Sequence, residues 1–284
     1  MKRLTIILII LATALQAISQ IKMPMGSKSE VEKFYKTTTY VVMKNEFMSD
    51  YNEAIKVAVE KHWTATPVKF VKACEFEKLR HDDDKSFLVI NIAYFDGDDA
   101  KFEFMILSLG GSKYKTVDDM PTLCAVPLCY YDDEDEDKYT YKLGAMLKHC
   151  QTHVALCREH PELTKETILD YYTSNTGDLA DKTLYLLKND VSEDLRNNSA
   201  LKSAYPFNAE FVTAEKIEEL TNANDDKALI VHIINPYDGN GQPYCIKLII
   251  DASKGMLYYY DFQKLKKNTI GHITSDDLKK LSKK

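Results

Sequence analysis

The sequence contains an internal repeat, and this repeat limits the possible folds more than any other feature. Four blocks of residues in the first half recur in the same order in the second half, at a nearly constant offset. The matched pairs are 39–46 with 183–190, 68–71 with 209–212, 83–89 with 225–231, and 95–98 with 237–240. Repetition on this scale indicates that one structural unit occurs twice. We therefore expect two tandem copies of a single domain.

Each copy has the same pattern of expected elements, β-α-β-α-β-β-β-α. In the first copy, Ser49 is a suitable N-cap for a helix in which Ile55, Val59 and His62 share one face. The expected strands are 40–44, 68–71, 86–95, 101–108 and 123–130 in copy one, and 184–188, 209–212, 228–237, 242–251 and 256–261 in copy two. An Asp-Gly pair lies in each expected hairpin turn. The pattern predicts an α/β fold in which each copy has a mixed sheet of about five strands covered by helices.

Alternating apolar residues in the fourth strand of each copy predict strands with one buried face. The alternating residues are Phe102, Phe104 and Ile106 in copy one, and Tyr244, Ile246 and Leu248 in copy two. A helical segment, 139–175, has no full counterpart in copy two. The expected organisation is a signal peptide (1–19), an N-terminal linker (20–37), domain 1 with an added helical connector (38–176), and domain 2 (177–284).

The first 19 residues have the pattern of a signal peptide. Lys2 and Arg3 precede an apolar run at 4–15, and the small residues at 17–19 place cleavage before Gln20. The alternative is a membrane anchor, but the run is shorter than the roughly 20 residues that span a bilayer. No later stretch is apolar enough to span one, so we expect an exported protein in the periplasm or outside the cell.

The net charge limits the partners that we expect, and the cysteine spacing limits what can be said of disulfides. Cleavage removes two cations and moves the formal net charge from -6 to -8. This acidic balance argues against nucleic acid or anionic lipid as a partner. The six cysteines are irregularly spaced, so the sequence identifies no disulfide pairs.

The strongest candidate for metal chemistry is a set of four residues in the helical segment. His149, His153, Cys157 and His160 lie within an arc of about 80° on one helix face. Histidines four residues apart are a known metal-ligand spacing, so the face could hold a zinc or copper ion. The general base of an HExxH metalloprotease is absent.

The same helix also fits a purely structural interpretation. Residues 143, 147, 150, 154 and 157 form a regular apolar stripe that suits a protein core. The histidines would then lie at the edge of the stripe, where the helix meets solvent.

Three further features were considered as sites. The acidic run 132–137 could attract calcium, but it lacks the glycine and spacing of a calcium loop, so a solvated loop fits better. The loop 110–113 resembles a phosphate loop only superficially and more simply turns one strand into the next. The sequence contains no GxSxG motif of a serine hydrolase.

The repeat itself bears on function, because the copies share strands and turns but no polar cluster suited to acid-base chemistry. The matched charged pairs all suit surface positions; they are Lys44/Lys188, Glu46/Asp190, Glu77/Glu218 and Asp96/Asp238. We therefore expect a non-enzymatic binding or assembly module of the cell envelope. Its partner would be an envelope protein or surface component that binds at the surface between the domains. The alternative is a metal-binding protein or metal-dependent hydrolase that uses the His149/His153 face.

Overall fold

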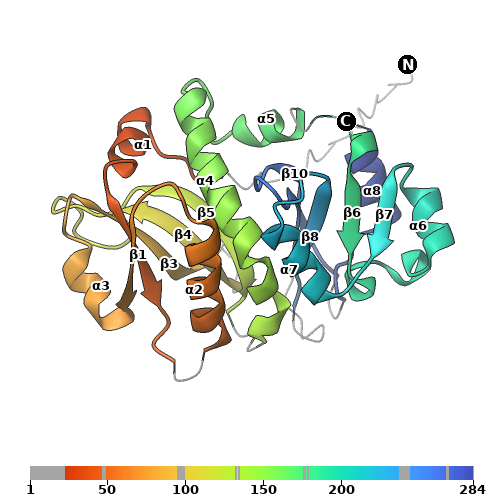
Figure 1. Ribbon diagram of the computed structural model, residues 1–284, viewed down its shortest axis with the longest axis horizontal. Coiled ribbons are helices and arrows are strands. Elements are labelled where there is room, and N and C mark those ends of the chain that lie inside the picture. Colours follow the sequence, from red (N-terminus) through yellow and green to blue (C-terminus); the bar gives the residue numbers. More distant parts are fainter. Residues whose placement is uncertain are drawn as a thin grey trace, which may run out of the picture.

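The computed structural model describes residues 23–46, 49–94, 100–131, 133, 135–174, 177, 179–236, 244–266 and 269–283. Within these residues the strands form two five-stranded sheets that lie side by side, with the long helix α4 (Leu143–Glu159) between them (Figure 1). The predicted signal peptide and both predicted Asp-Gly turns lie outside the described residues.

The two sheets have the same strand order and the same strand directions. The first sheet, in the order β2-β1-β3-β4-β5, contains β1 (Thr38–Met43), β2 (Val68–Lys72), β3 (Lys85–Tyr94), β4 (Lys101–Leu109) and β5 (Thr122–Tyr130). The second sheet, in the order β7-β6-β8-β9-β10, contains β6 (Thr183–Leu186), β7 (Asn208–Phe211), β8 (Ala228–Ile234), β9 (Tyr244–Asp251) and β10 (Leu257–Lys264). In each sheet the strand that comes first in the sequence, β1 or β6, is parallel to both of its neighbours. The last three strands in the sequence form an antiparallel meander. This confirms the predicted mixed α/β fold in two similar copies.

Parallel neighbours require crossover connections, and helices supply them in both copies. The first copy uses α2 (Asp50–His62) and α3 (Ala73–Leu79), and the second uses α6 (Asn198–Ala204) and α7 (Ala214–Asn222). Helix α2 begins as predicted, because the Ser49 hydroxyl accepts a hydrogen bond from the Asn52 amide at 3.2 Å. In the second copy two 3₁₀ turns, η4 (Lys188–Asp190) and η5 (Glu193–Leu195), precede a shorter helix, so the copies differ most here.

The prediction of one buried face for β4 and β9 is wrong for β9 and only partly right for β4. In β4, Phe102 is buried as predicted, but Met105 and Leu107 on the opposite side of the strand are also fully buried, while Ile106 is half-buried. Strand β9 is buried from residue 245 to residue 251. Helices cover both faces of the second sheet, and a sheet covered on both faces has no polar side.

The region predicted as one helical segment forms two helices. Helix α4 ends at His160, and Pro161 follows, which cannot continue the hydrogen-bonded helix. Helix α5 (Ile168–Ser174) then passes beside the second sheet. Two 3₁₀ turns, η1 (Glu136–Lys138) and η2 (Thr140–Lys142), precede α4, and η3 (Leu179–Asp181) precedes β6. Within the segment predicted as a linker, residues 28–34 form helix α1 (Lys28–Phe34), whose Val31 and Phe34 side chains are buried.

Helix α4 joins the cores of the two copies. It contacts α2 and β5 of the first copy and α7 and β9 of the second. One buried apolar cluster therefore runs from the first sheet through α4 to the second sheet. A separate cluster packs α6 and α8 (Ser275–Ser282) against the far face of the second sheet, and a small one packs α3 against the first. The expectation that His149 and His153 lie where the helix meets solvent is wrong, because Gly255 of the second copy packs on His149, and Pro24 and Tyr172 of α5 contact His153.

Polar contacts also join the copies. The Lys148 ammonium donates hydrogen bonds to the main-chain oxygens of Thr221 and Ala252, both at 2.7 Å. The Tyr130 hydroxyl donates to the main-chain oxygen of Tyr244, also at 2.7 Å. These buried hydrogen bonds fix the copies in one relative orientation, since each buried carbonyl oxygen needs a donor.

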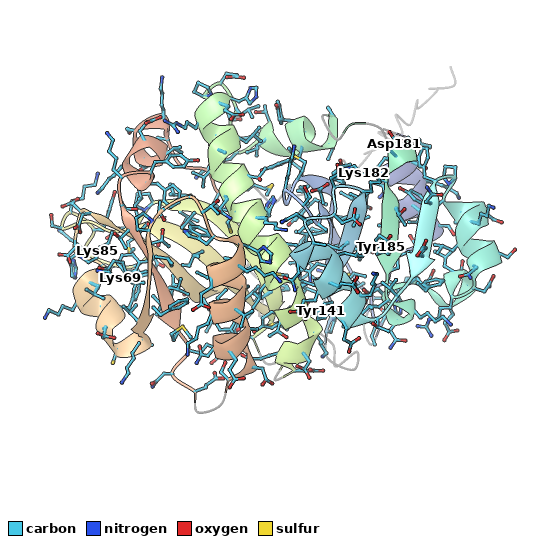
Figure 2. All side chains as sticks on the ribbon, viewed as in Figure 1. Lys69, Lys85, Tyr141, Asp181, Lys182 and Tyr185 are labelled. Carbon is cyan, nitrogen blue, oxygen red and sulfur yellow. The ribbon has the colours of Figure 1, made fainter. Side chains whose placement is uncertain are left out.

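Figure 2 shows the side chains on this framework, with Tyr141 near the boundary between the copies and Lys182 at one end of β6. The Lys182 ammonium lies 3.1 Å from a carboxylate oxygen of Asp251. No helix in the described part of the chain is both long and apolar enough to span a bilayer.

Candidate functional site

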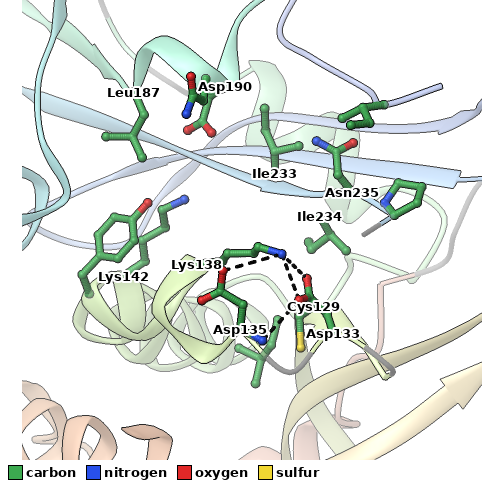
Figure 3. Close-up of a pocket in the computed structure, with 15 residues that line it drawn as sticks. Cys129, Asp133, Asp135, Lys138, Lys142, Leu187, Asp190, Ile233, Ile234 and Asn235 are labelled. Carbon is green, nitrogen blue, oxygen red and sulfur yellow. Dashed lines mark hydrogen bonds and ion pairs between the residues drawn. The ribbon is translucent and has the colours of Figure 1, made fainter. Parts of the chain in front are cut away.

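A pocket of about 470 Å³ opens at the junction of the two copies (Figure 3). One wall comes from the end of β5 and the turns η1 and η2, and the opposite wall from η4 and the end of β8. The lining residues are Leu128, Cys129, Asp133, Asp135, Lys138, Tyr141, Lys142, Leu187, Asn189, Asp190, Ile233, Ile234, Asn235, Pro236 and Ile270. Apolar and polar side chains contribute about equally to this lining, a mixture that suits a small polar ligand or a peptide segment.

Asp190 contributes a buried carboxyl group to this pocket. It ends the turn η4, where its main-chain oxygen accepts a hydrogen bond from the Ile273 amide at 2.8 Å. Its Oδ2 atom is buried and has no hydrogen-bond partner among the described residues. Burial raises the pKa of Asp190, while Lys142 and His272 act in the opposite direction. The surface position expected for Asp190 from the repeat is therefore wrong for its carboxylate.

Lys142 supplies a positive charge across the pocket. Its side chain is only 3% exposed, and its ammonium lies 4.9 Å from the centre of the Tyr141 ring. It forms no ion pair with any carboxylate in the described part of the chain, although it is close enough to Asp190 to affect that carboxyl. In Figure 3 the Lys142 and Asp190 side chains point into the same space.

Lys138, Asp133 and Asp135 line one side of the pocket. The Lys138 ammonium lies 2.9 Å from both carboxylate oxygens of Asp133 and 3.8 Å from Asp135. These residues belong to the acidic run considered for calcium. Glu136 of the same run lies 2.8 Å from the Lys44 ammonium and accepts a hydrogen bond from the Tyr51 amide. The described carboxylates at 133, 135 and 136 therefore have cationic partners already, and Lys44 is not at the surface position expected for it.

A second candidate site lies inside the core, on α4. The predicted residues His149 and His153 are brought together with Cys124 of β5, and one ligand atom from each lies within 4.8 Å of the others. All three side chains are at most 1% exposed. Burial lowers the pKa of His149 and lowers that of His153 to about 3, so both imidazoles are neutral.

The other two predicted ligands lie elsewhere. Cys157 is buried one turn beyond His153 on α4, and burial raises the pKa of its thiol to about 11. His160 caps the end of the helix, where its ring nitrogens lie 3.1 Å from Glu162 and 2.9 Å from the Tyr171 hydroxyl. The helix periodicity identified the two histidines, but Cys124 is brought to them only by the packing of a strand 25 residues earlier in the sequence.

The amides of Gly110 and Gly111, in the loop at 110–113, donate hydrogen bonds to main-chain oxygens of the protein. The Gly110 amide donates to the Lys85 main-chain oxygen and the Gly111 amide to that of Arg80, both at 2.9 Å. The Ser112 hydroxyl faces the Asp83 carboxylate at 3.2 Å. These amides are not available to a phosphate, so the loop serves as a connection between strands.

Comparison with known proteins finds no relative. No protein-family model, curated protein or solved structure matches this chain significantly.

Proposed function

We propose that this protein is an exported, non-enzymatic binding module of the cell envelope that holds its partner in the pocket between the two copies. The signal-peptide pattern at residues 1–19 supports export. The observation that carries the binding proposal is the buried Oδ2 of Asp190, which has no hydrogen-bond partner among the described residues and belongs to a side chain that lines the same pocket as the buried Lys142. A buried carboxylate oxygen without a donor is costly, and a partner that donates to it removes this cost.

The charges indicate what the partner presents. An amine would complement Asp190, and a carboxylate would complement Lys142. A short peptide with free termini offers both groups, as does a protein loop with neighbouring lysine and glutamate side chains. Apolar side chains of the partner would then contact Ile233, Ile234 and Leu187.

The pocket supports binding better than catalysis. Its one thiol, Cys129, has a pKa far above the usual value because it is buried beside carboxylates, so it remains protonated and weakly nucleophilic. Among the described lining residues no histidine accompanies it as a base. The alternative of a metal-dependent hydrolase at His149 and His153 has less support, because those side chains are enclosed and a substrate needs an open ligand position.

Binding of dipeptides tests the proposal. We expect dipeptides with free termini and apolar side chains to raise the thermal unfolding temperature with increasing concentration, because they bind only the folded state. Dipeptides with acetylated and amidated termini should have no such effect. Asp190→Asn and Lys142→Met should each abolish the rise.

Matched controls use exposed residues of the same charge. Asp181→Asn and Lys279→Met change charges outside the pocket and should leave the effect intact. If blocked dipeptides stabilise the protein equally, or if Asp190→Asn responds like the unmodified chain, recognition by these two charges is wrong.

A further inference from the structure

The cluster of Cys124, His149 and His153 is built as a ligand site. Metal–sulfur and metal–nitrogen bonds of about 2.3 and 2.0 Å place ligand atoms about 3.5 to 4 Å apart. The three atoms here already lie within 4.8 Å of one another, so small side-chain movements suffice to close around an ion.

The hydrogen bonds of both histidines leave one ring nitrogen of each with a lone pair that an ion can use. His149 Nδ1 lies 2.8 Å from the Gly255 main-chain oxygen, and His153 Nε2 lies 2.8 Å from that of Pro24. A carbonyl oxygen only accepts, so each of these nitrogens carries the proton. The lone pairs are then on His149 Nε2 and on His153 Nδ1, where the Tyr172 hydroxyl now donates at 3.0 Å. Metal-binding histidines commonly donate their other N–H to a carbonyl in this way.

The burial and the net charge of the three ligands determine which ion fits the site. The ligand set carries one negative charge when the Cys124 thiol is deprotonated, because both imidazoles are neutral ligands. All three side chains are enclosed, and an uncompensated charge there would be strongly destabilising. A monovalent ion makes the site neutral, whereas zinc would leave one positive charge in the core. Thiolate with imidazole is also a donor set that soft copper ions favour.

We propose that Cys124, His149 and His153 bind one copper(I) ion. On binding, the Cys124 S–H bond breaks, an S–Cu bond forms, and one proton is released to solvent. The copper remains in the +1 state, so no oxidant or reductant takes part. The three side chains are at most 1% exposed, so the ion would lie in enclosed surroundings.

Competition with a chromophoric copper(I) chelator, under anaerobic and reducing conditions, tests this assignment on the naturally processed chain. All variants carry Cys74→Ser, because Cys74 is the exposed thiol among the six free cysteines. We expect one equivalent of copper(I) to bind, with release of one proton. Cys124→Ser should lower the affinity at least about 100-fold, since it removes the only charged ligand. An equimolar amount of zinc should not displace the copper.

A second thiol on the same helix provides a control. Cys157 is buried one turn beyond His153 and lies outside the three-residue cluster, so Cys157→Ser removes a neighbouring sulfur atom that we do not assign as a ligand. This substitution should change the affinity less than about threefold, a factor that corresponds to about 0.7 kcal/mol. His160→Ala should have no effect, because His160 lies at the exposed end of the helix.

X-ray absorption of the copper-loaded unmodified chain identifies the donor atoms without any substitution. It therefore tests the proposal even if a core variant fails to fold. We expect one sulfur and two nitrogen donors. Two sulfur donors, no sulfur donor, or displacement of copper by equimolar zinc would each overturn the assignment. The copper site is independent of the interdomain pocket, so Asp190→Asn should leave copper binding unchanged.

Discussion

The ammonium of Lys247 lies 2.8 Å from a carboxylate oxygen of Asp277, and both side chains are almost completely buried. Lys247 belongs to β9 and Asp277 to α8, so this ion pair joins the last helix to the second sheet. The Tyr259 hydroxyl donates to the other carboxylate oxygen at 2.6 Å, and the Thr274 amide donates at 2.8 Å. The carboxylate thus has a partner on each oxygen, which is the condition under which a buried charge is tolerated.

Asp277→Ala should destabilise the protein strongly. The substitution leaves the Lys247 charge buried without a partner, and such a loss costs about 3–5 kcal/mol in the free energy of unfolding. Urea denaturation measures the change. Asp276→Ala is the control, because Asp276 is exposed and its ion pair with Lys279 should contribute less than about 1 kcal/mol. Equal effects of the two substitutions would contradict the buried-pair interpretation.

The same pair should make stability depend on acid pH. Burial alone would raise the pKa of Asp277, but the Lys247 ammonium and the Tyr259 hydroxyl hold it below the usual value. Because the pKa of Asp277 is lower in the folded state, its ionised form stabilises the fold at pH values above the unfolded-state pKa of about 3.9. This stabilisation is lost as the pH falls through the folded-state pKa. Between about pH 5 and pH 2, the unfolding free energy of the unmodified chain should therefore fall more steeply than that of Asp277→Asn. Parallel curves would rule this contribution out.

Lys148→Met should loosen the contact between the two copies. It removes the donor shared by the main-chain oxygens of Thr221 and Ala252, and each unsatisfied buried carbonyl costs about 1–3 kcal/mol. We expect a loss of about 2–4 kcal/mol in denaturant unfolding. Lys254→Met, at an exposed lysine in the turn after Ala252, should change stability by less than about 0.5 kcal/mol.

Gly255→Ala tests the close approach of a turn to α4. Gly255 has a φ of +72°, and a Cβ atom there would lie 2.1 Å from the His149 main-chain nitrogen. Gly177 has a similar φ of +75°, but no atom of the residues that the structure describes lies within 4 Å of the corresponding position. Gly177→Ala should therefore cost only the backbone strain of about 1–2 kcal/mol. Gly255→Ala should cost more than about 4 kcal/mol, because main-chain atoms must also move. Similar thermal unfolding temperatures for the two variants would contradict the packing described here.

Asp190→Asn should stabilise the protein while it abolishes ligand binding. Burial raises the pKa of Asp190 in the folded state. A raised folded-state pKa means that the protonated carboxyl stabilises the fold, and this stabilisation is fully present at pH values below the unfolded-state pKa of about 3.9. It is lost as the pH rises through the folded-state pKa. A neutral asparagine avoids that loss, and we expect a gain of about 1 kcal/mol at pH 7. Asp181→Asn should be neutral within about 0.5 kcal/mol, and a loss of stability in Asp190→Asn would show that the carboxylate has a structural partner.

Local patterns in the sequence predicted much of the fold. The matched blocks predicted two copies with the same order of elements, and the helix after Ser49 begins where its cap predicts. These features depend on neighbouring residues, since capping, alternation and turn chemistry act over a few positions. The same local patterns placed His149 and His153 on one face of a helix.

Tertiary packing decided what those residues contact. Whether the histidines of α4 face solvent depends on distant segments, because the second copy contacts His149, and Pro24 and Tyr172 contact His153. Cys124 joins them because β5 packs against α4, and Asp190 and Lys142 face one pocket because β5 and β8 meet at the junction of the copies. The sequence by itself therefore determined the elements and their repetition through short-range interactions. Only the three-dimensional packing of distant segments determined burial, and burial decides which polar groups lack partners and can bind a ligand.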